Sequence, residues 1–151
     1  MFPRQPVGPE PSLLSDEEAM AQVIQPARQI VRAAGLRDVT GGFAFESCND
    51  QGAPPFRGRV EMSFAMPAGA EPDDYFIEIA GTMVGRGWAN GPPPGTCPSG
   101  VVIHTSTVMA IIGRTAVVGR GSVQLRGSCR NMTDHRHDGK TVGTVITDQL
   151  R

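Results

Sequence analysis

The sequence has no long apolar run, only one lysine and no closely spaced pair of cysteines. The longest candidate for a membrane span, residues 101–118, is interrupted by His104, Thr105, Arg114 and Thr115, whereas a span needs about 20 apolar residues. The first residues also lack the basic region and apolar run of a signal peptide. Either the protein is cytosolic, or its targeting segment lies outside this sequence.

The charges are almost balanced, with 14 basic residues against 15 acidic ones and a net charge of −1. This balance provides no long-range attraction for nucleic acid or for an anionic membrane surface. We therefore expect no nucleic-acid partner.

The three cysteines, Cys48, Cys97 and Cys129, form no CxxC pair, which excludes a zinc ribbon and a thioredoxin motif. The residues alone leave two arrangements open: three free thiols, or one disulfide with one thiol left over. Cys48 and Cys129 each end a strand-like run and enter a polar turn, a pattern compatible with a bridge between two strand ends.

The length of 151 residues fits one domain, and 19 glycines and 13 prolines predict short elements joined by many turns. Residues 1–14 are rich in proline and lack hydrophobic periodicity, so we expect a flexible leader or tether there. Residues 15–151 are then a single α+β domain.

Two segments have the signals of helices. Ser15 and Glu18 form a capping box, and apolar residues follow at spacings of three and four up to Ala34. Pro26 lies inside this pattern and predicts a kink, or a division into two short helices. A second apolar stripe predicts a helix that opens at Pro72 or Asp73 and runs over residues 72–84.

The remaining periodic segments alternate apolar and polar residues, as strands with one buried face do. The predicted strands cover residues 41–48, 57–66, 100–105, 108–113 and 115–127, with a last short strand or tail at 141–146. This order predicts an α+β fold in which an antiparallel β-sheet of about five strands has two helices packed on one face, a two-layer sandwich.

The segment richest in chemically active side chains contains Asp134, His135 and His137. On a strand the two histidines would share a face, and two imidazoles with a nearby carboxylate can hold a divalent metal ion. No established zinc signature accompanies them, and a solvated polar loop explains the same residues. No other cofactor is expected.

No constellation in the sequence predicts an enzyme. A set of Cys97, His104 and Asp50 can be drawn as a thiol-enzyme triad, but their positions give no specific support for it. Trp88, followed by a proline-rich loop that contains Pro93, is a candidate binding surface. A core position for the tryptophan is the alternative.

Several loops together resemble one family, the LppJ-type lipoproteins of mycobacteria. The matching blocks are SCNDQG at 47–52, PPFRG at 54–58, GW at 87–88 with GPPPG at 91–95, CRN at 129–131 with TDH at 133–135, and DEEAMAQVIQPARQIV at 16–31. They follow the family order and extend from about residue 16 to 138.

This resemblance implies a protein anchored to the cell membrane by a lipidated N-terminal cysteine and facing the extracytoplasmic side. The sequence has no lipobox and no N-terminal cysteine, so a truncated chain or a different start site is required. Export favours a disulfide, and the family-like blocks imply that Cys48 pairs with Cys129 while Cys97 is the odd thiol. The family has no established activity, so the resemblance implies a location and no reaction.

We therefore expect a non-enzymatic domain of the cell envelope that binds a protein partner or a small ligand. The binding surface would be the sheet face without helices, or the loop that contains Trp88 and Pro93. The alternative is an extracytoplasmic protein that binds a divalent metal through His135 and His137.

Overall fold

The first helix, α1 (Asp16–Ala34), begins with the predicted capping box. The Ser15 hydroxyl accepts a hydrogen bond from the Glu18 amide, and the Glu18 carboxylate accepts one from the Ser15 amide. Gly35 ends the helix in the left-handed conformation that glycine adopts without strain. The computed structural model describes residues 12–96 and 98–151, so most of the predicted leader lies outside the described residues.

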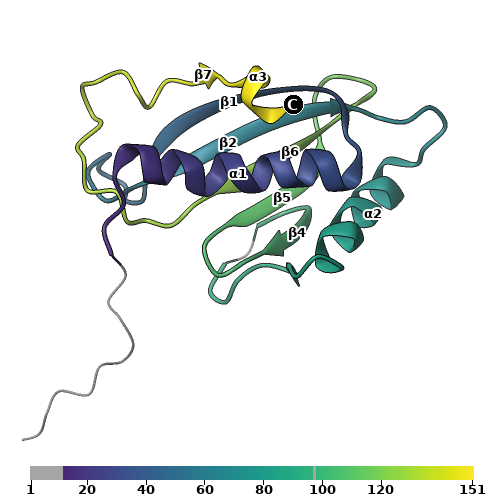
Figure 1. Cartoon of the computed structure of the whole chain (residues 1–151), viewed down its shortest axis with the longest axis horizontal. Coiled ribbons are helices and arrows are strands. Elements are labelled where there is room, and N and C mark those ends of the chain that lie inside the picture. Colours follow the sequence, from purple (N-terminus) through teal and green to yellow (C-terminus); the bar gives the residue numbers. More distant parts are fainter. Residues whose placement is uncertain (1–11, 97) are drawn as a thin grey trace, which may run out of the picture.

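Seven strands form one antiparallel sheet in the order β3-β4-β5-β6-β2-β1-β7 (Figure 1). The strands are β1 (Arg37–Ser47), β2 (Phe56–Ala65), β3 (Ala89–Asn90), β4 (Val101–His104), β5 (Met109–Arg114), β6 (Arg120–Arg126) and β7 (Thr144–Val145). Two further helices, α2 (Pro72–Val84) and α3 (Thr147–Leu150), follow β2 and β7. None of the helices in the described ranges has the length and hydropathy that a bilayer span requires.

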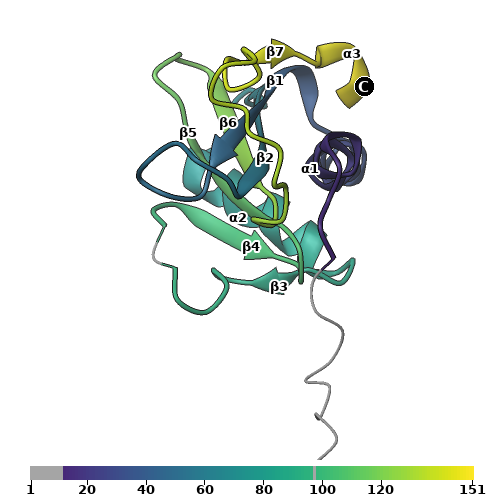
Figure 2. The ribbon, with the colours of Figure 1, turned by 90° about the vertical axis from the view of Figure 1, so that its left-hand side faces the viewer.

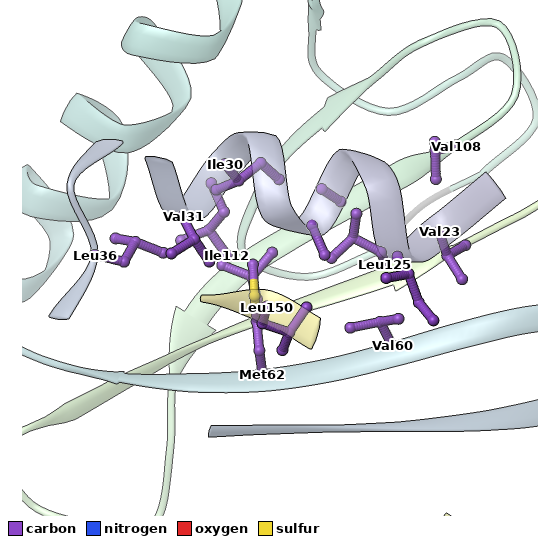
Figure 3. Packing of buried hydrophobic residues seen from close by; sticks show 14 of the residues in the cluster. Val23, Ile30, Val31, Leu36, Val60, Met62, Val108, Ile112, Leu125 and Leu150 are labelled. Carbon is purple, nitrogen blue, oxygen red and sulfur yellow. The ribbon is translucent and has the colours of Figure 1, made fainter. Parts of the chain in front are cut away.

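The helices cover one face of the sheet because alternate strand residues are apolar. On β2, Val60, Met62 and Phe64 are buried, and their neighbours across the sheet are buried as well. Figure 2 shows α1 end-on at one side of the strands. Figure 3 shows apolar side chains of α1 directed toward the sheet and α3, where they meet, among others, Val60, Met62, Ile112, Leu125 and Leu150.

The predicted α+β class with an antiparallel sheet is confirmed, and the number of elements differs. The structure has seven strands and three helices in its described residues, where about five strands and two helices were predicted. Strand β3, with two residues, and α3, with four, were not predicted, and the two-residue strand β7 lies within the last short strand or tail expected at 141–146. Such short elements contain too few residues to show a hydrophobic period.

The predicted division at Pro26 is wrong, because α1 continues through this residue as one helix. Val23 and Ile24 before the proline, and Ala27 and Ile30 after it, are all buried in the core. Packing on both sides of Pro26 offsets the lost hydrogen bond.

Gly58 sets how closely α1 approaches β2, and its replacement gives a testable prediction. A Cβ atom at this position would lie 2.7 Å from the Ala19 carbonyl oxygen, so the helix would have to move. We expect Gly58→Ala to lower the free energy of unfolding by about 2 kcal/mol, measured by urea denaturation. Gly113→Ala is the control, because a Cβ atom there meets nothing within 4 Å. Equal losses in the two variants would contradict this account.

Candidate functional site

The sheet face opposite the helices contains a hollow of about 1130 Å³, which we call the open-face hollow. Strands β1, β2, β5 and β6 contribute to it, and the segments at 99–100 and 143–145 lie at its borders. Its lining includes hydroxyl groups, glycines, one amide and two charged side chains, namely Thr40, Gly42, Glu61, Ser63, Ser99, Gly113, Arg114, Thr115, Ser122, Gln124 and Thr144.

The register of the strands explains why this face is hollowed. Gly113 pairs with Ser122, Ser122 with Ser63, and Ser63 with Thr40. Four small residues thus form one row across four strands of the open face. Small side chains leave the space above the strands unfilled.

Gly113 is the clearest sign that this space is not needed for internal packing. A Cβ atom at Gly41, Gly58 or Gly121 would lie within 2.8 Å of other atoms of the core. At Gly113 it would meet nothing within 4 Å. A glycine inside a strand weakens that strand, and such glycines often mark a close approach by a ligand or another backbone.

Polar interactions cross the open face next to this row. The Gln124 amide Nε2 donates to Glu61 Oε1 over 2.9 Å. Glu46, further along the same face, accepts hydrogen bonds from Arg57 and Arg59. Burial raises the pKa of Glu46, but the hydrogen bond and charge of Arg57 outweigh this effect and hold the pKa below its usual value.

The structure places His135 in the interior of the protein, in the loop after β6. Its side chain has no exposed surface, and its ring stacks on Phe45 with 3.9 Å between ring centroids. Nδ1 lies 2.6 Å from Asp138 Oδ2, and Nε2 lies 2.9 Å from Asn131 Oδ1. Asp16 Oδ1, at the start of α1, is 3.2 Å from Nε2. The imidazole therefore connects the C-terminal loop to β1 and α1.

The other two residues of the candidate metal site point elsewhere. His137 is exposed, and Asp134 forms an ion pair with Arg136 at 2.6 Å. The Arg136 hydrogen bonds lower the pKa of Asp134 to about 2. Across residues 12–96 and 98–151, no group of three His, Cys, Asp or Glu side chains is arranged to hold a metal ion.

The two carboxylates beside His135 give a prediction of acid sensitivity. Burial raises the pKa of Asp16 and of Asp138, but hydrogen bonds outweigh it and hold both below the usual 3.8. For Asp16 these bonds include the Asn131 and Lys140 side chains; for Asp138 they are the Lys140 amide and His135. A carboxylate with a lowered folded pKa stabilises the protein above its unfolded pKa, and this contribution is lost as the pH falls through the folded pKa.

We therefore expect the free energy of unfolding to decrease as the pH falls below 3.8, the usual value of both groups. In an Asp16→Asn/Asp138→Asn variant this decrease should be shallower, although the variant starts less stable. Urea denaturation at a series of pH values measures both slopes. If the free energy of unfolding fell equally steeply with pH in the two proteins, Asp16 and Asp138 would not be the source of the acid sensitivity.

A disulfide joins Cys48 to Cys129, which are separated by 81 positions. Cys48 directly follows β1, and Cys129 lies three positions beyond the end of β6. Close to the bridge, the Phe56 and Asn131 backbones exchange two hydrogen bonds, of 2.6 and 3.1 Å. The pairing implied by the family resemblance is thus present in the structure. Cys97 lies outside the described residues.

The residues of the other candidate surface lie at the border of the helix layer. Trp88 is 6% exposed and belongs to the hydrophobic core. Its amide donates to the Met83 carbonyl over 3.1 Å. Pro93 is half-buried in the following loop, where its carbonyl accepts a hydrogen bond from the Thr96 hydroxyl.

The sequence did not single out the polar residues of the open-face hollow. Glu61 and Ser63 were noticeable only as the polar members of an alternating strand. Ser122 and Gln124 have the same pattern on β6. Their meeting depends on the pairing of β2 with β6, two strands far apart in the sequence, which residue spacing does not reveal.

Comparisons with known proteins agree with one another. A family profile described as "Putative lipoprotein LppJ" matches residues 15–149. Proteins of that name from Mycobacterium tuberculosis strain H37Rv and from Mycobacterium bovis are each 46% identical to this chain over 137 residues. The match covers 91% of this chain and 71% of each relative. No solved structure matches. The chain therefore belongs to the LppJ lipoprotein family.

Proposed function

We propose that this chain is the binding domain of a lipid-anchored protein of the cell envelope, and that it is not an enzyme. The name of its relatives supports the lipid anchor, which attaches the domain to the cell membrane. The Cys48–Cys129 disulfide supports the extracytoplasmic side, because disulfides persist in oxidising compartments.

The observation that carries the proposal is the open-face hollow. Its volume of about 1130 Å³ is slightly above the range of about 300–1,000 Å³ found for ligand sites. The hydroxyl groups of its lining offer donors and acceptors to a protein segment or a small polar ligand. Glu61 and Gln124 would fix its orientation.

Photo-crosslinking in the native envelope tests this function. A photoreactive amino acid replaces Gly113 in the full-length lipoprotein, and after irradiation the envelope fraction is analysed for adducts. The control carries the same amino acid at Glu17, an exposed position of α1. We expect a discrete adduct from position 113 that is absent from position 17.

A competing substitution makes the result specific to the hollow. Ser122→Trp fills the hollow beside position 113 and should abolish the adduct while the domain remains folded, as judged by circular dichroism. Adducts of equal intensity from positions 113 and 17, or none from position 113, would argue against the open face as the binding surface.

A further inference from the structure

A second hollow, of about 410 Å³, lies in the helix layer, and we call it the helix-end groove. It is formed by the last turns of α1 and by the residues at and just after the end of α2, two helices that contact each other (Figure 1). Its lining consists of Gln29, Arg32, Ala33, Met83, Arg86 and Trp88. The groove is thus separate from the open face.

The end of α2 explains why an arginine and a tryptophan meet here. The Arg86 amide donates to the Met83 carbonyl over 2.9 Å, which closes the last turn. Gly87 then adopts a φ of 105°, a conformation that favours glycine. This turn directs Trp88 back under the helix end, while Arg86 remains exposed. The groove therefore has an apolar floor of Met83 and Trp88 below a charged border.

The border of the groove is positive, and its two arginines form no ion pair with the other described residues. Within the described ranges, neither Arg32 nor Arg86 has a carboxylate oxygen within 4.0 Å, and the same holds for Arg28, one turn before Arg32. Arg28 Nε is buried and has no hydrogen-bond partner. Among the other arginines of the described residues, Arg37 and Arg130 also have no ion pair, whereas seven form one, namely Arg57, Arg59, Arg114, Arg120, Arg126, Arg136 and Arg151.

We propose that the helix-end groove binds an acidic segment of a partner protein. An apolar side chain of that segment contacts Met83 and Trp88, and flanking carboxylates pair with Arg32 and Arg86. Arginine suits this task because its planar guanidinium binds a carboxylate through two hydrogen bonds. The whole chain has a net charge of −1, whereas the groove is positive. The attraction for an acidic segment is therefore confined to the groove.

The single tryptophan of the sequence makes a direct binding assay possible, because Trp88 lines the groove. The probe is a synthetic peptide in which aspartate alternates with leucine, and it is titrated into the whole protein at low salt. We expect a saturable change in Trp88 emission. Arg32→Ala/Arg86→Ala should raise the Kd at least about tenfold, and added sodium chloride should weaken binding.

Matched controls separate this site from general charge effects. Arg136→Ala/Arg151→Ala removes the same charge from two exposed arginines elsewhere and should leave the Kd unchanged. A peptide with asparagine in place of aspartate should not bind.

Three results would overturn the proposal. The first is an unchanged Kd in Arg32→Ala/Arg86→Ala, and the second is equal binding of the asparagine peptide. The third is a dimer of the unliganded domain in sedimentation experiments that is lost in the same double variant. That result would assign the groove to a second copy of the chain.

Discussion

We expect the replacement of Cys48 and Cys129 by serine to lower the free energy of unfolding by about 4 kcal/mol. The bridge closes a loop of 81 positions, and in the chain-entropy model a loop of this length restricts the unfolded chain by about that amount. Since single domains have a total stability of about 5–15 kcal/mol, the variant should be close to unfolding. Urea denaturation of the oxidised protein and of the variant measures the difference.

The background for this comparison is a Cys97→Ser protein, in which thiol exchange with the bridge cannot occur. Dithiothreitol added to that protein should reproduce the effect of the serine substitutions. A loss below about 1 kcal/mol in both experiments would mean that the bridge does not contribute to folding as proposed.

His135→Ala should give the second-largest loss, about 3 kcal/mol. The substitution leaves a cavity next to Phe45 and Phe56, the two rings that contact the imidazole. It also leaves the buried Asn131 without one of its hydrogen-bond partners. The loss is measured by thermal and urea denaturation.

His137→Ala is the matched control, because His137 lies two positions away and is exposed. It should change stability by less than about 0.5 kcal/mol. His135→Phe fills the cavity without restoring the hydrogen bonds, so its loss should be intermediate. If both histidine-to-alanine variants lost the same amount, His135 would not connect the loop to the core.

Local sequence signals predicted the elements that are long enough to show a period. Ser15 and Glu18 marked the start of α1, and the apolar residues at 60, 62 and 64 marked the buried face of β2. Strand β3 and helix α3 were missed, whereas β7 lies within the last short strand or tail predicted at 141–146. Helix α3 depends on contacts with distant residues, such as the Gly41 amide of β1, which donates to the Thr147 hydroxyl.

The role of His135 was not predictable from its neighbours in the sequence. A strand was the premise of the candidate metal site, because two histidines two positions apart share a face only there. The segment is a polar loop, the alternative that the sequence left open, and this loop turns His135 inward and His137 outward. Asp16, which lies near the imidazole, is more than 100 positions away.

The open-face hollow was predicted only as a sheet face without helices. The hollow depends on the alignment of small residues on four strands, and its border depends on the C-terminal segment at 143–145. Both features follow from strand register. The pairing of β2 with β6 joins strands that are far apart in the sequence, and residue spacing does not reveal it.

We propose that this domain folds on the oxidising side of a membrane, with Cys48 joined to Cys129, and binds its partner there. Peptide mapping by mass spectrometry on unreduced, denatured protein isolated from the native envelope tests this claim most directly. We predict one peptide pair linked through Cys48 and Cys129, with Cys97 as the alkylated thiol. Alkylation of all three cysteines in protein that was never exposed to reductant would contradict the extracytoplasmic location and the function built on it.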